Sequence, residues 1–290
     1  MDFVSVERIV ELLHLEQEGW VGGHSQKTIT PPAAWPPYGG DIIFDNVTLR
    51  YAPHLDPALK NINLTIPGGS TTALLGRTGS GKSTLALSLL ATIPPSCEEG
   101  EGDGGEEEGG KRGSITLAGL DIADVDKQML RSRITFLAQD PVLFPGTLRQ
   151  NLDPLSLHSD EDCASVLERV ASKHGWKLET IIEAGGENLS QGQRQLVGLA
   201  RAVLRRSSVV ILDEATASID AETAEEVQKV LREELRGSTV VVIAHRLEAV
   251  RGADFFVRLE RGRAVEQGRV GEEGVLMDGE GNGEGSSESG

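Results

Sequence analysis

A glycine-rich stretch between two apolar segments constrains the fold more than any other feature of the sequence. Residues 76–84 read GRTGSGKST, which fits the pattern G-x-x-x-x-G-K-[ST] at every position. The preceding segment STTALLG predicts a buried strand, and the following KSTLALSLLATI has the apolar spacing of a helix. An ordinary flexible turn is the alternative, but the flanking strand and helix favour a phosphate-binding loop.

The residue types of this loop suit phosphate binding for physical reasons. Glycines allow the backbone N–H groups from Thr78 to Ser83 to turn toward phosphate oxygens. The Lys82 ammonium supplies a charge near the β and γ phosphates, and the Ser83 hydroxyl is a suitable Mg²⁺ ligand. The predicted nucleotide-binding residues here are Gly76, Arg77, Thr78, Gly79, Ser80, Gly81, Lys82, Ser83 and Thr84.

A second stretch, SVVILDEATASID at 208–220, predicts a buried strand that ends in two carboxylates. Ligands of parallel α/β sheets bind at the carboxyl ends of strands, so Asp213 is a predicted Mg²⁺ ligand. Glu214 follows one residue later, where a carboxylate can polarise an attacking water. Alone the pattern is weak, since many such matches are simple strand ends; together with Lys82 it predicts a nucleotide hydrolase.

Three single residues complete the candidate site. Gln139 follows the strand pattern ITFLA and is a predicted contact of the metal and the water. His245 follows VVVIA and is a predicted contact of the γ-phosphate, although a strand-end His or Gln is more often only a surface group. Tyr51 ends VTLRY and is predicted to stack on a base, with core packing as the alternative.

Composition excludes several classes of function. The formal net charge is −17, and much of it falls in two acidic stretches, 94–113 and 265–290. Nucleic acid is therefore not an expected partner, because binding it needs clustered Lys and Arg. The two cysteines have no metal-binding spacing, which favours a reduced intracellular setting. No apolar run approaches the roughly 20 residues of a membrane span, and no signal peptide is predicted.

The order of patterns predicts an α/β fold with a mixed sheet, an antiparallel β patch and a helical subdomain. Residues 1–40 are predicted to hold a helix, with Val6, Ile9, Val10 and Leu13 on one face, and then a Pro/Gly linker. The domain itself is predicted over 41–268. An acidic low-complexity insertion lies at 97–112, the helical subdomain at about 140–205, and a disordered acidic tail at 269–290.

The segment ENLSQGQRQ at 187–195 is an unusual helix start. Its small and polar residues precede the helical pattern LVGLARAVLRR and are expected to leave backbone N–H groups open. Such an end binds an anion well, which raises the question of why the chain carries a second phosphate-binding feature.

Together these motifs resemble the ATP-binding domain of an ABC transporter, a P-loop NTPase, over about 41–268. The resemblance assigns adenine stacking to Tyr51, the Walker A loop to 76–84, and the Q-loop to Gln139. It assigns Walker B to Val209–Asp213, the catalytic carboxylate to Glu214, the D-loop to Ala217–Asp220 and the switch histidine to His245. The signature motif is Ser190, Gln191, Gly192 and Gln193, which in the family contacts the ATP of an opposing domain.

Finer features are similar to the C (multidrug-resistance-associated) subfamily, and most to its second nucleotide-binding domain. The segments GTLRQNLDPLSLHSDED and DEATASID carry this similarity. Gln191 stands where the consensus signature has glycine, and the acidic insertion is longer than the usual turn. If the resemblance holds, the chain is a piece of a longer transporter, a truncated gene model or a separately encoded subunit.

The resemblance implies an ATPase that binds ATP and Mg²⁺ and powers an exporter. Lys82, Gln139, Glu214 and His245 are the expected catalytic residues, and Ser83, Gln139 and Asp213 the metal ligands. Its implied partners are a second nucleotide-binding domain and membrane domains absent from this chain, which would hold it at the cytoplasmic face of a plasma or vacuolar-type membrane. A soluble ABC-type ATPase acting on ribosomes or DNA and a non-hydrolysing regulatory remnant are the alternatives.

Overall fold

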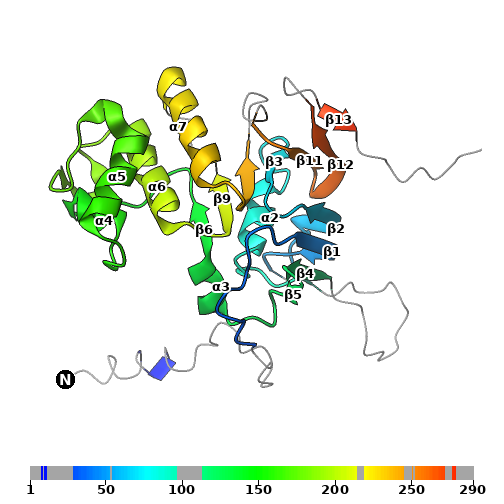
Figure 1. The fold of residues 1–290 in the computed structure, drawn as a ribbon. Coiled ribbons are helices and arrows are strands. Elements are labelled where there is room, and N and C mark those ends of the chain that lie inside the picture. The colour runs from blue at the N-terminus through cyan, green and yellow to red at the C-terminus, as the bar shows by residue number, and fades with distance from the viewer. Residues whose placement is uncertain are drawn as a thin grey trace, which may run out of the picture.

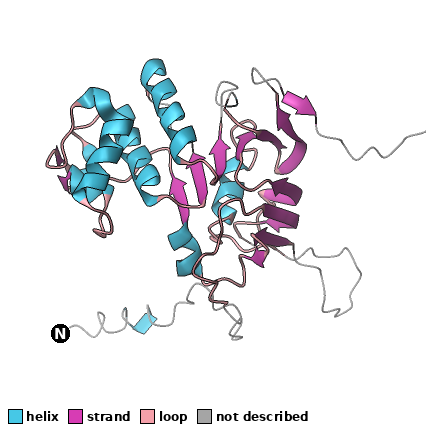
Figure 2. Cartoon of the chain, viewed as in Figure 1, coloured by secondary structure: helices cyan, strands magenta, loops and turns pink. Residues whose placement is uncertain are grey.

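A computed structural model describes residues 8, 10–11, 29–52, 54–96, 113–213, 219–244, 250, 252–271 and 276–278. Within this part of the chain, strands dominate one side of the molecule and helices the other (Figure 2). The predicted α/β class, with a mixed sheet, an antiparallel patch and a helical region, is confirmed.

A mixed sheet forms the centre of the described structure, with strand order β13-β12-β11-β3-β10-β9-β6. The strands β11, β3, β10, β9 and β6 are parallel, whereas β12 and β13 are added antiparallel. The inner strands are continuous apolar runs because both faces of the sheet are covered. The bounds are β3 (Thr71–Leu75), β6 (Ile134–Leu137), β9 (Val209–Asp213), β10 (Thr239–Ile243), β11 (Phe255–Glu260), β12 (Arg263–Val270) and β13 (Leu276–Asp278).

A smaller antiparallel sheet has the order β2-β1-β4-β5. Its strands are β1 (Ile42–Leu49), β2 (Leu59–Ile66), β4 (Ser114–Leu117) and β5 (Leu120–Asp121). Alternate residues of β2 are buried, as expected of a sheet with one face on the core. The predicted antiparallel pairing of the first two strands is confirmed.

The helical region lies on the opposite side of the mixed sheet from β1, β2 and β4 (Figure 1). It contains α4 (Leu148–Leu152), α5 (Asp160–Ala171) and α6 (Gln191–Arg205), with a short hairpin of β7 (Gly146–Thr147) and β8 (Ile181–Ile182). The predicted N-cap is confirmed, since Ser159 Oγ accepts a hydrogen bond from the Asp162 N–H at 3.1 Å. The other α-helices given bounds in the described structure are α2 (Lys82–Ser88), α3 (Lys127–Arg133) and α7 (Ala221–Glu234).

Apolar clusters of buried residues cover both faces of the mixed sheet. Val209 and Ile211 of β9 face the core shared with the antiparallel sheet and α2, whereas Val210 and Leu212 face the core shared with the helical region. Alternation along one strand thus joins both halves of the molecule to a single sheet.

Helix α2 is shorter than the predicted helix over 82–93. After Ser88 the backbone continues with turns of the 3₁₀ type, in which Leu89, Leu90 and Ala91 each donate to the carbonyl three residues earlier. Ala91 has a φ of 49°, which ends the helix before the Pro94–Pro95 pair.

Residues 269–270 and 276–278 do not match the predicted disordered tail, because they belong to strands. Strand β12 continues to Val270, and β13 pairs with it antiparallel, with Arg269 opposite Met277. The segment was missed because its apolar residues are too few to show alternation within a Gly/Glu-rich sequence. Residues 279–290 and the insertion at 97–112 lie outside the described residues.

The domain also begins earlier than the predicted boundary at 41. Trp35 is buried in the core, and its indole Nε1 donates to the Leu117 carbonyl at 3.1 Å. Arg133 donates to the carbonyls of Pro32 and Trp35. Of the predicted N-terminal helix, residues 8, 10 and 11 are described as helical, and Val10 is exposed.

Candidate nucleotide site

The loop between β3 and α2 requires its glycines for two different reasons. Gly76, Gly79 and Gly81 have φ values of 148°, 79° and 104°, a region that side chains disfavour. A Cβ on Gly76 would lie 2.4 Å from the Leu259 carbonyl oxygen, and one on Gly81 would lie 2.6 Å from Leu59 Cδ2. Gly79 has open space around it, so only its conformation demands glycine.

Lys82 is folded into this loop. Its Nζ donates to the carbonyl oxygens of Gly76 at 2.7 Å and Arg77 at 3.0 Å, and the residue is only 4% exposed. Gly81 precedes α2 as its N-cap and offers no side-chain cap. The buried Lys82 ammonium and the uncapped start of α2 therefore lie in the same loop.

Ser80 adds an unexplained polar atom. Its Oγ is buried and has no hydrogen-bond partner in the described structure. Its carbonyl accepts from the Gly262 N–H at 3.0 Å, so the turn between β11 and β12 holds the loop from outside. An orphaned hydroxyl inside the loop fits an incoming anion or an ordered water.

The parallel strands bring the other predicted residues to the same edge of the sheet. Leu74, Ile243 and Asp213 form one register row across β3, β10 and β9. Leu137 of β6 pairs with Leu212, so Gln139 follows at the same edge. Asp213 is half-buried and Gln139 is exposed. Parallel pairing thus places a carboxylate and an amide at the same edge of the sheet as the glycine loop, at the ends of strands two and three positions from β3.

Glu214 and His245 lie outside the described residues. They follow Asp213 and Ala244 directly, and the Ala244 N–H donates to the Leu74 carbonyl at 3.1 Å. Their predicted roles stay predictions.

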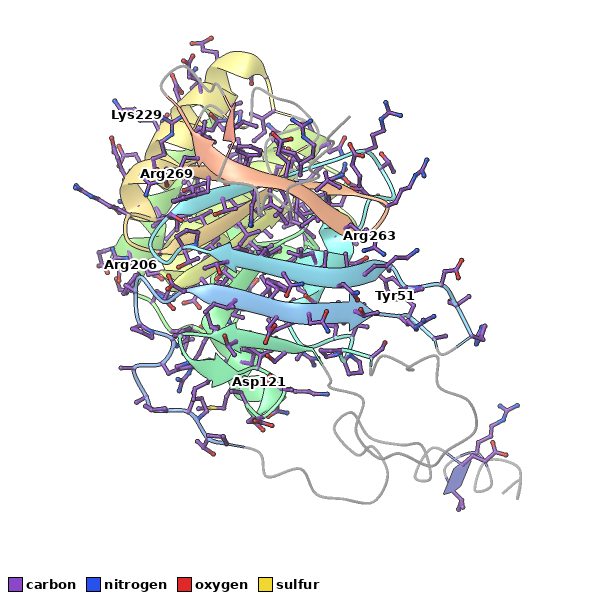
Figure 3. The ribbon with its side chains drawn as sticks, turned by 90° about the vertical axis from the view of Figure 1, so that its right-hand side faces the viewer. Tyr51, Asp121, Arg206, Lys229, Arg263 and Arg269 are labelled. Carbon is purple, nitrogen blue, oxygen red and sulfur yellow. The ribbon has the colours of Figure 1, made fainter. Side chains whose placement is uncertain are left out.

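Tyr51 lies at the loop rather than in the core. Its side chain is 58% exposed, and its hydroxyl is 3.0 Å from Thr84 Oγ1. The core-packing alternative is therefore wrong. Figure 3 shows Tyr51 at the surface, toward the same end of the molecule as Arg263 of β12. A ring at this place, tied to the first turn of α2, suits stacking on a flat base.

The signature segment caps the helix that follows it. Ser190 Oγ accepts from the Gln193 N–H at 3.2 Å, and Gln193 Oε1 accepts from the Ser190 N–H at 2.9 Å. The expectation that the N–H groups stand open is thus only partly correct, because the Gln193 N–H is used by the cap. Ser190 and Gln191 are exposed, and Gly192 is half-buried.

Asp220 also caps a helix. Its Oδ1 accepts from the Thr223 N–H at 2.9 Å at the start of α7. This backbone hydrogen bond holds the pKa of the Asp220 carboxyl below its ordinary value, because it favours the charged form. The structure therefore gives Asp220 a local role besides the predicted one.

One residue was missed by the sequence reasoning. Gln195 of α6 is 1% exposed, and its Nε2 donates to the Gln139 carbonyl at 3.2 Å. It joins the signature helix to the strand end that carries Gln139. A glutamine on the apolar face of a helical pattern was the only signal, and its partner could not be read from the sequence.

The donor set suits a magnesium nucleotide. The Ser83 side chain is exposed at the start of α2, and Asp213 ends β9 at the same edge of the sheet, with β10 between β9 and β3. Among the described residues no three His, Cys, Asp or Glu side chains form a metal cluster. Mg²⁺ takes one or two protein ligands and phosphate oxygens for the rest, so a hydroxyl and a carboxylate are sufficient protein donors.

Comparison with known proteins agrees with this architecture. A family model described as ABC transporter matches residues 59–217, more than half of the chain. The chain is 41% identical over 273 residues to ATP-binding cassette sub-family C member 2 of Rattus norvegicus, covering 92% of this chain and 16% of that protein. It is 40% identical over 271 residues to sub-family C member 3 of Homo sapiens, covering 91% and 16%.

A solved structure of a bacterial Atm1-family ABC exporter with ATP bound has the same fold. The TM-score between the two is 0.76 at 24% sequence identity. The match covers 92% of this chain and 44% of that one. At this identity the likeness supports the fold alone.

The fold and the loop define an ATP-binding domain of the ABC type. The chain belongs to the ABC transporter family. The predicted resemblance to the C subfamily is confirmed by its similarity to members 2 and 3. The chain spans 16% of the length of these relatives.

Proposed function

We propose that the chain is the ATP-hydrolysing domain of an ABC exporter and works as half of a nucleotide-bound pair. The observation that carries the proposal is the glycine loop around buried Lys82, with Asp213 at the same edge of the sheet, two strands away from β3. Intact groups for binding, metal coordination and water activation favour a hydrolase over a regulatory remnant.

ATP binds through the loop and Tyr51. Backbone N–H groups of Thr78 to Ser83 face the phosphates, and the Lys82 ammonium exchanges its carbonyl partners for β and γ phosphate oxygens. The buried Ser80 hydroxyl lies in the same turn and donates to an anion or to an ordered water. Tyr51 stacks on adenine while its hydroxyl stays near Thr84.

Ser83, Gln139 and Asp213 are the residues that would hold Mg²⁺. The ion would supply positive charge that offsets the charge of the phosphates. Glu214 polarises the attacking water, and His245 orients the γ-phosphate. The Gln195 contact keeps the strand end of Gln139 in register with the signature helix.

A second nucleotide-binding domain completes the site. Ser190, Gln191, Gly192 and Gln193 begin α6 within the helical region, whereas the glycine loop follows β3 in the centre of the sheet (Figure 1). We assign this signature to the ATP held by the opposing domain, with Asp220 at the shared boundary. This assignment answers why one chain carries two phosphate-binding features.

Membrane domains are the other proposed partner, and they would hold the chain at the cytoplasmic face of a membrane. The described residues contain no helix that could span a bilayer. The helical region instead exposes large apolar side chains, which mark an interaction surface. These are Val142, Phe144, Leu155, Leu157 and Ile181. Similarity to sub-family C suggests a place as second nucleotide-binding domain of such a transporter.

Glu214→Gln tests the proposed hydrolysis. The amide keeps the size of the side chain but cannot accept the proton of water, so ATP binding should persist while turnover falls at least about tenfold. Binding is measured with a fluorescent ATP analogue and turnover by phosphate release. Glu233→Gln, which changes an exposed carboxylate of α7, should leave both unchanged.

Lys82→Met should abolish most nucleotide binding, because it removes the buried ammonium that the loop folds around. Wild-type protein that binds ATP but never releases phosphate would identify a regulatory remnant. Unchanged turnover in Glu214→Gln would remove that residue from the proposed role.

A further inference from the structure

A cavity of about 490 Å³ lies between the two sheets, away from the nucleotide site. Its walls come from β1, β2, β3, β11 and β12, including Phe44, Leu64, Thr72, Phe255 and Arg269. This volume falls within the usual range of about 300 to 1,000 Å³ for small-molecule sites.

One wall is a flat register row of the mixed sheet. Thr72 of β3 pairs with Phe255 of β11, and Phe255 pairs with Arg269 of β12. In-register residues of neighbouring strands point to the same face, so these three side chains face the antiparallel sheet together. Phe44 and Leu64, both buried, form the opposite wall.

The row runs from a buried polar atom to an exposed charge. Thr72 is 1% exposed, and its Oγ1 has no hydrogen-bond partner in the described structure. Arg269 is exposed, and its guanidinium carbon lies 5.4 Å from the centre of the Phe255 ring. None of the residues that line the cavity is acidic.

The cavity is separate from the nucleotide site. Thr72 precedes Gly76 by four residues along β3, which is about 13 Å in an extended strand. Arg263 lies at the end of β12 next to the loop, where the Gly262 N–H contacts Ser80, and Arg269 lies at the opposite end (Figure 3). A ligand here would not overlap ATP.

We propose that this cavity binds a small amphipathic anion. Its apolar body, of the size of one or two aromatic rings, fills the space between Phe44 and Phe255. Its single carboxylate or sulfonate pairs with Arg269, and a polar atom of the ligand or a water meets Thr72 Oγ1. Apolar walls favour the body, and the Arg269 guanidinium at the rim selects the anion over its neutral analogue.

Calorimetric titration of the full chain with 2-naphthoate tests the proposal. The wild type should bind one equivalent, and Arg269→Gln should weaken binding at least about fivefold. Arg263→Gln is the matched control, because it removes an exposed arginine of the same strand outside the cavity lining. Neutral 2-naphthalenemethanol should bind the wild type more weakly than 2-naphthoate does. Its affinity should not fall further in Arg269→Gln.

Thr72→Val provides a second readout that does not depend on charge. The change removes the unpartnered hydroxyl at constant shape, so it should raise the thermal midpoint of unfolding and retain naphthoate binding within about threefold. Saturating Mg-ATP should leave the naphthoate affinity unchanged, which separates this site from the nucleotide site whether or not the proposed ATPase function holds.

Three results would overturn the proposal. Absence of saturable naphthoate binding would show that the cavity holds water only. Equal losses of naphthoate affinity in Arg269→Gln and Arg263→Gln would show that the anion is attracted nonspecifically to the arginines of the strand. Displacement of naphthoate by ATP would place it in the nucleotide site.

Discussion

Gly76 and Gly79 differ in what a side chain would meet, although both have positive φ. A Cβ on Gly76 would approach the Leu259 backbone oxygen and Ser80 Oγ at 2.4 and 2.5 Å, whereas a Cβ on Gly79 would meet nothing within 4 Å. The backbone oxygen cannot rotate away, so relief at Gly76 requires movement of β11 against the loop. The two positions of this one motif therefore require glycine for different physical reasons.

Gly76→Ala should lower the free energy of unfolding by about 2 to 3 kcal/mol, because strain and overlap add. Gly79→Ala should lower it by about 1 kcal/mol, the cost of the left-handed conformation alone. Urea unfolding followed by circular dichroism measures both. Equal losses in the two variants would contradict the assigned contact with Leu259.

At the scale of the element, α5 and α6 begin in the same way. Ser159 and Ser190 each accept a hydrogen bond from the N–H three residues later, at 3.1 and 3.2 Å. Both serines are exposed, and both helices pack on the same core. They differ in sequence context, since only Ser190 belongs to the proposed signature.

Ser190→Ala and Ser159→Ala should therefore each lower stability by about 1 kcal/mol, the usual cost of a lost N-cap. Only Ser190→Ala should also lower ATP turnover, by roughly tenfold, because it removes a proposed contact with the opposing nucleotide. Parallel unfolding and phosphate-release assays separate the two effects. Similar turnover losses in both variants would assign Ser190 a structural role alone.

At the scale of the whole molecule, the proposed site is divided between two domains. The glycine loop belongs to the sheet, and the signature belongs to the helical region, so completion of the site requires a second domain in this proposal. In a longer chain, covalent connection would supply that domain at high effective concentration. The isolated chain must find it by diffusion.

The turnover rate per molecule should therefore rise with protein concentration and reach a plateau, following mass action for a dimer. Glu214→Gln should form an ATP-dependent dimer that is visible in sedimentation velocity, because slow hydrolysis preserves the bound nucleotide. A constant rate per molecule from a strictly monomeric protein would exclude the shared site.

Much of the fold and site could be predicted from local pattern. Some features depend mainly on residues close together in the sequence, so their residue pattern was enough to predict them. These are the glycine loop, the strand ending at Asp213, the antiparallel pair and the N-cap at Ser159. Boundaries were less predictable. Trp35, β13 and the early end of α2 depend on packing or on short segments without periodicity.

The sequence alone determined which groups can hold phosphate and metal, because a loop and its flanking elements form from contiguous residues. Only the tertiary structure decided which groups meet. Parallel register brings Asp213 and Gln139 to the edge of the sheet that carries the loop, Gln195 reaches the Gln139 carbonyl, and residues of two sheets line an open cavity that includes Thr72. Such contacts join segments up to about two hundred residues apart, and their geometry is set by how strands pair and sheets pack rather than by any local pattern.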